Sequence, residues 1–466
     1  MSFSPVKVCE VELSEPVNGI SAPGYGSALV LARWYSEPLA VVDIPLSDGA
    51  ADASQVAQAL WLSVGQQVTA RYAAAPLAVP AQSVAAPREL AMSVAAQAGF
   101  GGGSAAPAVS VSGPEALRES GLRLPSSPSY LLGRETTLRN APSASVIICT
   151  RDRAERLDSS LTAVLRQDYP DFEVIVVDNA PVNDAVADLI ARRNAAGTGG
   201  VPLRRIVETR PGLSWARNTG LHAASGRIVA FLDDDEHPDQ HWLAELARGF
   251  TMGKQVTGVS GLVLPALLDT PAQCLYEQFG GHSKGRGLVP QVFDVASHAT
   301  QHPLYPLPAF GVGASMAFDR LALIGIGGFD VALGAGTAAR AGEDTAAIAD
   351  LMLDGGTFVY QPGAVMWHEH RAEFAEMERQ LDGYGSGLTA FYTRALLRNP
   401  RRLLTLARLA PRALHDLRGK DSVRTATMGE DYPASMRRAT VRGMLSGPFR
   451  YLRSRQAQTR VRAQGA

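Results

Sequence analysis

The stretch Ile228-Val229-Ala230-Phe231-Leu232-Asp233-Asp234-Asp235 joins five apolar residues directly to three carboxylates. An apolar run of this length predicts a buried strand, and open α/β sheets bind their ligands at the carboxyl ends of the strands. Adjacent acids repel one another unless a cation lies between them, and Mg²⁺ or Mn²⁺ is held by carboxylates together with phosphate oxygens. The stretch therefore predicts a site for a metal-bound phosphate compound. A solvated turn in which one Asp caps the next helix is the alternative.

Two other apolar runs also end in polar residues. Ser145 to Cys149 is followed by Thr150-Arg151-Asp152-Arg153, and Glu173 to Val177 is followed by Asp178. Leucine and valine recur at helical spacing between them, so strand, helix and strand form a right-handed parallel crossover with the two polar strand ends side by side. The same alternation continues to Asp233. It predicts an α/β fold with a mixed, mostly parallel sheet flanked by helices.

These blocks resemble the successive motifs of family 2 glycosyltransferases with the GT-A fold, the fold of nucleotide-diphospho-sugar transferases. The order and spacing agree over roughly residues 144–392, a little over half of the chain. The blocks that carry the resemblance are Ser145 to Arg153, Tyr169 to Asn179, Arg210 to Ser214 with Ala216-Arg217-Asn218, Ile228 to Asp235, Gly311 to Phe318, Ile326 to Asp330, Gly342-Glu343-Asp344 and His368 to Arg371.

The resemblance implies a role for each matching residue. Asp344 matches the catalytic base, and Glu343 either positions it or contacts the acceptor. The residues that match the nucleotide-sugar site are Thr150, Arg151, Arg153, Asp178, Arg217, Asp233 and Asp234. Among them, Asp178 matches the acid that binds the nucleobase and Arg217 a basic residue near the diphosphate. Arg151 stands where the family often has an aromatic residue, which weakens any expectation of stacking on the base.

The resemblance also implies the metal ligands. Asp233 and Asp235 match the two ends of the Asp-X-Asp motif, with Asp235 as the direct ligand, and His368 is expected to contact the metal or the diphosphate. For two of the predicted site residues, Asp344 and His368, a purely structural role is the alternative. Asp344 precedes a helical run and would be favoured at a helix N-terminus, and a histidine at a strand end is often a hydrogen-bonded core residue.

The expected function is inverting, metal-dependent transfer of a sugar, a hexosyltransferase-like reaction. The donor would be a nucleotide-diphosphate sugar, the cofactor Mn²⁺ or Mg²⁺, and the acceptor a hydroxyl of a glycan or lipid-linked glycan. Negative charge develops on the leaving diphosphate, where a cation stabilises it, and a carboxylate must take the hydroxyl proton. A processive synthase is disfavoured, because the sequence lacks transmembrane spans and a Gln-X-X-Arg-Trp block.

Two alternatives to this function stay open. A sugar-phosphate nucleotidyltransferase shares the sheet architecture but would need a glycine-rich loop after the first strand, where Thr150-Arg151-Asp152-Arg153 has no glycine. A catalytically silent scaffold that binds sugar nucleotides is the other alternative, because a fold does not guarantee activity. No nucleic-acid partner is expected.

The chain of 466 residues divides into four predicted parts. Residues 1–72 alternate like three strands and a helix, which predicts a small α+β module. Residues 73–142 are rich in Ala, Pro, Gly and Ser and predict a partly disordered linker. Residues 143–395 form the predicted GT-A domain, and residues 396–466 a basic helical tail.

Charge is distributed unevenly along the chain. From Arg394 to Ala466 there are seventeen Lys and Arg against four Asp and Glu, a net of +13, although the whole chain carries −1. Apolar residues are interleaved among these arginines, a composition that suits an anionic membrane surface. An intramolecular brace against the acidic remainder is the alternative. With no signal peptide and three unpaired cysteines, the expected location is the cytoplasm, with peripheral contact at the inner face of the plasma membrane.

Overall fold

The computed structural model describes residues 3–74, 129–278, 280–283, 285–305, 310, 313–418 and 432–464. The chain separates into two compact units. The smaller one comprises residues 1–136 with 267–274, and the larger one comprises residues 137–266 with 275–466. Each unit has its own hydrophobic core and is described by itself. The four-part division predicted above stays a prediction.

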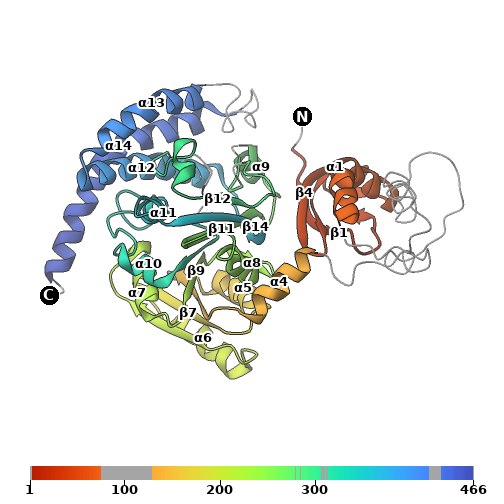
Figure 1. Ribbon diagram of the computed structural model, residues 1–466, viewed down its shortest axis with the longest axis horizontal. Helices are drawn as coiled ribbons and strands as arrows, with labels where there is room; N and C mark the ends of the chain where they lie inside the picture. The colour runs from red at the N-terminus through yellow and green to blue at the C-terminus, as the bar shows by residue number, and fades with distance from the viewer. Residues whose placement is uncertain are drawn as a thin grey trace, which may run out of the picture. The chain divides into compact units, whose positions relative to one another are not determined.

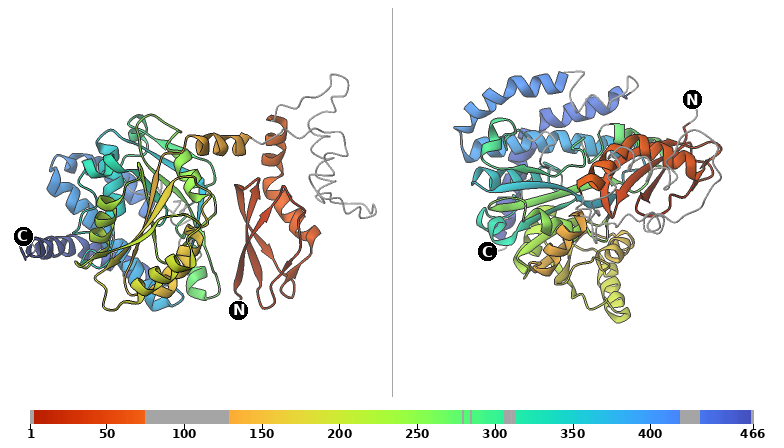
Figure 2. Two further views of the ribbon diagram at one scale, coloured as in Figure 1. Left: turned by 90° about the horizontal axis from the view of Figure 1, so that it is seen from below. Right: turned by 45° about the vertical axis from the view of Figure 1, so that its right-hand side comes forward.

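The smaller unit is the α+β module that its alternation predicts. Its strands and helix are β1 (Val6–Glu12), β2 (Ile20–Ser21), β3 (Ser27–Trp34), β4 (Glu37–Pro45), β5 (Ala50–Ala51) and α1 (Ala53–Ala74). β1 pairs parallel to β3, and β3 pairs antiparallel to β4 through a turn in which Tyr35 and Ser36 have positive φ. Val56, Leu60 and Val64 recur every fourth residue of α1 and are buried against this sheet (Figure 2).

One helix lies inside the predicted linker. Residues Ser129–Arg139 form α4, whereas the linker was predicted to extend from residue 73 to residue 142. The composition did not reveal this helix, because Gly133 and three hydroxyl residues weaken its propensity for helix. Residues 75–128, which hold the Ala/Pro/Gly-rich core of the prediction, lie outside the described residues.

A nine-stranded sheet is the centre of the larger unit (Figure 1). Its strands follow the order β10-β14-β11-β13-β9-β6-β7-β8, and β12 pairs with β14. The bounds are β6 (Ala144–Thr150), β7 (Phe172–Asn179), β8 (Leu203–Glu208), β9 (Ile228–Asp233), β10 (Glu236–Pro238), β11 (Val256–Pro265), β12 (Gln291–Phe293), β13 (Met316–Asp319) and β14 (Thr357–His368).

The direction of β13 decides which strand ends share an edge. β9, β6, β7 and β8 are parallel neighbours, so Thr150, Asp178 and Asp233 end at one edge of the sheet. β13 runs antiparallel to both β9 and β11, and β14 is parallel to β11. The strand direction reverses twice between β9 and β14, so β14 runs in the same direction as β9. His368 at the end of β14 therefore lies at the same edge as Asp233.

Helices cover both faces of this sheet and bury it. One face packs against α5 (Ala154–Val164), α6 (Ala185–Ala196) and α8 (Trp242–Gly249). The other face packs against α7 (Leu213–Ala223), α10 (Arg320–Gly325) and α11 (Glu343–Leu353). Within the described residues the larger unit also has the 3₁₀ turn Ala296–Ala299, α12 (Phe374–Arg398), α13 (Arg402–Arg418), α14 (Ala434–Gln464) and the second half of α9 (Pro271–Gln278). This mixed, mostly parallel sheet flanked by helices, with a small separate module, confirms the predicted fold class.

The described part of the basic tail contains the helices α13 and α14, and α14 packs closely along α12 (Figure 1). Glycines allow this approach, because a Cβ at Gly443 would overlap the Asp382 carbonyl and a Cβ at Gly385 would overlap the Thr440 carbonyl. The buried Asp382 carboxylate then pairs with Arg450 at 2.6 Å and with Arg442 at 2.9 Å. Among the helices in the described ranges, none combines the length and apolar character that a bilayer crossing needs.

Candidate active site

The strand ends converge as the sequence predicts. Register places Thr150 opposite Asp178 and Cys149 opposite Asp233. The buried Asp234 carboxylate accepts hydrogen bonds from the Thr150 hydroxyl at 2.6 Å and from Arg153 at 3.2 Å. Thr150 and Asp234 therefore bind each other and hold the ends of β6 and β9 together, which is a structural role beside the nucleotide-sugar role expected of them.

Arg217 is the buried cation of the site. Its guanidinium is 2% exposed and pairs with Glu343 at 2.8 Å and with Asp233 at 3.2 Å. Burial, followed by the charge of Asp344, raises the pKa of Glu343 to about 7, against the opposing effect of Arg217. Burial and the charges of Asp235 and Asp234 raise the pKa of Asp233 to about 6, again against Arg217. The arginine is thus already engaged by two carboxylates.

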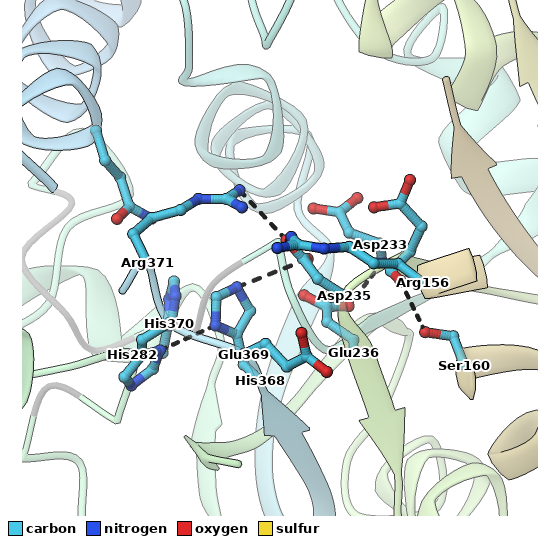
Figure 3. A network of polar contacts seen from close by, with 12 residues as sticks. Arg156, Ser160, Asp233, Asp235, Glu236, His282, His368, Glu369, His370 and Arg371 are labelled. Carbon is cyan, nitrogen blue, oxygen red and sulfur yellow. Dashed lines mark hydrogen bonds and ion pairs between the residues drawn. The ribbon is translucent and has the colours of Figure 1, made fainter. Parts of the chain in front are cut away.

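Asp235 is the point on which the other charged side chains converge (Figure 3). Its carboxylate is 4% exposed and lies 3.2 Å from the Arg371 guanidinium, 3.5 Å from that of Arg156 and 4.0 Å from that of Arg153. The His368 Nε2 lies 3.9 Å away from it. Sequence reasoning assigned no role to Arg156 or Arg371, because neither follows from a strand end or a spacing rule.

The residues beside Asp235 suit a divalent cation. Asp235, Glu236 and His368 are all buried and offer ligand atoms within 4.8 Å of one another. One oxygen of Glu236 is buried without a hydrogen-bond partner, and burial raises the pKa of this carboxyl well above its ordinary value. Burial also lowers the pKa of His368 to about 3, so its imidazole is neutral, the form that binds metals. Oxygen ligands with one imidazole fit Mn²⁺.

The structure thus groups two predicted metal ligands with Glu236, a residue to which the sequence assigned no role. Glu236 lies opposite His368 in the antiparallel pairing of β10 with β14. Its position directly after the three aspartates was a signal, but the pairing that brings it to His368 is not visible in the sequence. Asp233 was also predicted to bind the metal. Its carboxylate instead contacts Arg217, and it does not belong to this group of three.

Asp178 differs from its expected setting. It was predicted to bind a nucleobase, but its carboxylate is fully buried and accepts two hydrogen bonds from Arg205, at 2.7 and 2.9 Å. Its second oxygen is buried without a hydrogen-bond partner, and burial raises its pKa. Arg205 comes from the neighbouring strand β8. A nucleobase could reach the Asp178 carboxylate only if the Arg205 side chain moved away.

The two other predicted nucleotide contacts lie at the exposed rim. Arg151 and Arg153 have half-exposed side chains, and Arg151 comes within 3.7 Å of Asp152. Asp152 itself adopts a φ of 55° and accepts the Val182 amide at 3.0 Å. This turn directs the chain away from β6 and leaves the two arginines beside the strand ends.

Asp344 is held at the start of α11. The left-handed Gly342, with a φ of 96°, ends the preceding loop, so Glu343 and Asp344 form the first turn of the helix. One Asp344 oxygen accepts the Gly313 amide at 2.8 Å, and the other accepts the Thr345 amide at 2.7 Å. The carboxylate is half-buried, fixed by backbone donors and accessible to a ligand.

We expect the metal-free protein to lose stability as pH rises from about 4.5 to about 7. The pKa of Glu343 is about 7 in the folded chain and 4.5 ordinarily, so the folded state holds the extra proton in this window and its advantage fades as pH rises. A shift of this size corresponds to on the order of 3 kcal/mol. The free energy of unfolding, measured with urea at several pH values in this range, should fall less steeply with pH in Glu343→Gln than in the wild type. In exposed Glu155→Gln, the control, its slope against pH should be unchanged. Equal slopes for wild type and Glu343→Gln would contradict the assignment.

Part of the chain is similar to known glycosyltransferases. The glycosyl transferase family 2 profile matches residues 145–262. The glycosyltransferase AglE of Haloferax volcanii is 40% identical over 104 residues, which are 22% of this chain and 33% of that protein. The GalNAc(5)-diNAcBac-PP-undecaprenol beta-1,3-glucosyltransferase of Campylobacter jejuni is 28% identical over 150 residues, 32% of this chain and 44% of that protein. The chain thus spans a third to less than half of the lengths of these relatives.

Solved structures were compared as well. The mannosyltransferase PcManGT of Pyrobaculum calidifontis, in complex with GDP-Man and Mn²⁺, aligns with a TM-score of 0.43 and 20% identity, over 68% of this chain and 94% of that one. The family resemblance seen in the motif blocks is confirmed by the profile match. Residues 145–262, from the first strand of the large sheet to β11, are the part of the chain that matches the family 2 glycosyltransferase profile.

Proposed function

We propose that this protein transfers a sugar from a nucleotide-diphosphate sugar to an acceptor hydroxyl, with a divalent cation and with inversion at the anomeric carbon. The observation that supports this most is the convergence of Asp235, Glu236 and His368 with three arginines at the carboxyl edge of a family 2 domain. A carboxylate and imidazole group ringed by guanidiniums suits a cation together with an anionic leaving group.

In this proposal the diphosphate binds between cation and arginines. Asp235, Glu236 and His368 would hold Mn²⁺ or Mg²⁺, which stabilises the charge that develops on the leaving diphosphate. Arg153, Arg156 and Arg371 now share the Asp235 carboxylate. Guanidinium groups bind phosphate oxygens with two parallel hydrogen bonds, so these arginines are placed to exchange Asp235 for the diphosphate when the cation takes the carboxylate.

Asp344 is proposed as the general base. Its carboxylate is fixed by the Gly313 and Thr345 amides, so it would meet the acceptor hydroxyl without first ordering a side chain. Glu343 is better placed as a positioning residue, because Arg217 already binds it. One base and one displacement invert the anomeric centre, which is the stereochemistry we propose.

The acceptor is proposed to be a lipid-linked glycan. One relative is named for transfer to an undecaprenol-linked glycan, a substrate that resides in a membrane. In this chain, Val441, Leu445 and Phe449 recur every fourth residue of α14 and are 53%, 80% and 71% exposed. Arg437, Arg438 and Arg442 flank this apolar stripe and line a shallow groove with it. An apolar stripe with flanking arginines fits an anionic membrane surface.

Activity assays distinguish the two alternative functions from glycosyl transfer. A nucleotidyltransferase would form a nucleotide-sugar from a sugar phosphate, so its product distinguishes it from a glycosyltransferase in one assay. A silent scaffold would bind a nucleotide sugar and Mn²⁺ without turnover. The family 2 match favours glycosyl transfer over both.

We expect Asp235→Asn to abolish the Mn²⁺-dependent part of nucleoside diphosphate binding. An amide keeps the shape but loses the charge that a hard cation needs, so the loss should exceed the roughly 10–100-fold cost of removing an outer-shell partner. Calorimetric titration with and without Mn²⁺ measures it, and EDTA should reproduce the loss in the wild type. Asp171→Asn, exposed at the opposite end of β7, is the matched control. A folded Asp235→Asn protein with undiminished Mn²⁺-dependent affinity would reject Asp235 as a ligand.

Asp344→Asn should slow turnover by roughly 10²-fold or more while donor affinity changes little, because a general base acts on the acceptor. Single-turnover kinetics with a nucleotide sugar separates the two quantities, with Glu343→Gln as the neighbouring comparison. Near wild-type turnover in Asp344→Asn would move the base elsewhere. Product anomeric configuration, read by NMR, is an independent check, since retention rules out a single displacement.

Replacing Leu445 and Phe449 together by Glu should abolish sedimentation with phosphatidylglycerol liposomes. Each Lys or Arg near an anionic surface contributes on the order of 1 kcal/mol, and the two acids remove the apolar contact and oppose that attraction, so binding is lost at low salt first. Leu62→Glu on α1, a residue that is also 80% exposed, is the control. If the full-length protein does not sediment with these liposomes at low salt, α14 serves only as an intramolecular brace.

A further inference from the structure

Three buried histidines lie together beside the candidate active site. His282, His368 and His370 gather next to Asp235, as Figure 3 shows, and all belong to the larger unit. The proposed transfer uses His368 and assigns nothing to His282 or His370. Three imidazoles in one buried place are costly as cations, since they would repel one another, but as neutral groups they are the preferred ligands of several transition metals.

The spacing of the ring nitrogens is close to that of a metal site. The Nδ1 atoms of His368 and His370 are 3.0 Å apart, and each of the three residues offers a nitrogen within 4.8 Å of the others. Nitrogens bound to tetrahedral Zn²⁺ at about 2.1 Å lie about 3.4 Å from one another. The rings therefore need only a small adjustment to share one ion.

Each imidazole also has an outer partner for its second nitrogen. The His370 Nε2 lies 2.6 Å from a Glu277 oxygen, the His282 Nε2 lies 3.2 Å from the Tyr276 hydroxyl, and the His368 Nε2 faces Asp235 at 3.9 Å. Histidines that bind metals almost always use the other nitrogen in this way, most often with a carboxylate. The Nδ1 atoms of His368 and His370, which hydrogen-bond each other at 3.0 Å, would then turn to the shared ion.

The backbone around His282 is built to hold this arrangement. Gly281 has a φ of 51°, a conformation that favours glycine, and a Cβ at that position would displace the Glu277 carboxylate that contacts His370. Arg286 donates a hydrogen bond to the His282 carbonyl at 2.7 Å. His368 and His370 are fixed by the end of β14. Two separate parts of the chain thus present the three rings.

We propose that His282, His368 and His370 form a transition-metal site, here called the trihistidine site, that binds Zn²⁺ and leaves one position for water or another exchangeable ligand. It is distinct from the oxygen-rich group of Asp235 and Glu236, but both use His368. A neutral imidazole has one free lone pair, so the two cations exclude each other. If the proposed transfer is correct, Zn²⁺ in the trihistidine site withdraws His368 and inhibits it.

The test measures the binding of Zn²⁺, with no other ligand added, to the full chain prepared without a polyhistidine tag. Competition with a chromophoric chelator should give one tight Zn²⁺ per chain, and bound Co²⁺ should show the intense visible absorption of a four-coordinate ion. His282→Asn removes a ligand and should weaken Zn²⁺ binding more than 100-fold, whereas Glu277→Gln removes an outer charge and should weaken it about 10–100-fold. Exposed His222→Asn is the matched control and should change nothing.

Two comparisons decide the location of the Zn²⁺. His282→Asn should retain Mn²⁺ binding, and Glu236→Gln should retain Zn²⁺ binding. Zn²⁺ affinity that falls in Glu236→Gln but not in His282→Asn would place the ion in the oxygen-rich group and overturn the proposal, as would wild-type protein without tight Zn²⁺. Circular dichroism verifies folding, and Glu277→Gln serves if His282→Asn does not fold. Failure of sugar transfer would leave these binding results standing, so the two proposals fail separately.

Discussion

The arrangement of the site depends on one buried guanidinium. Arg217 on α7 pairs with Asp233 at the end of β9 and with Glu343 at the start of α11, and its side chain is 2% exposed. Removing one partner of a buried ion pair costs about 3–5 kcal/mol, because the charge that remains has no solvent. The pair thus fixes the strand end that leads to Asp235 and the helix start that carries Asp344. Both halves of the proposed reaction are positioned through the same side chain.

Local sequence was enough to predict the sheet and most of its polar edge. Each of the first strands is an apolar run that ends at a polar residue, and parallel order follows from the helices between them. Thr150, Asp178, Asp233 and Asp235 could therefore be placed at one edge. Arg205, Glu236 and Arg156 could not, because their partners come from register between distant strands and from the direction of a helix. The helix α4 was missed because Gly133 and its Ser and Thr residues lower its helix propensity.

The basic tail has two different faces, one suited to each of the two roles that the sequence presented as alternatives. Its inner face is a brace, since glycines bring α14 against α12 and Asp382 pairs with Arg340, Arg442 and Arg450. Its outer face keeps Leu445 and Phe449 in water. A helix whose packing needs are already met on one side has no folding reason to expose large apolar residues on the other. Charge counting cannot separate these faces, because arginines occur on both.

The number of residues that connect β9 to the short strand β10 determines which side chain lies beside His368. Asp234 and Asp235 alone connect β9 to β10, and the pairing sets Glu236 opposite His368 and His237 opposite Trp367. Deleting one residue from this connection would slide β10 by one position and turn its side chains to the other face of the sheet. An imidazole would then replace the Glu236 carboxylate beside His368. The number of residues after Asp233 thus selects between an oxygen-rich and a nitrogen-rich environment, independently of which residues they are.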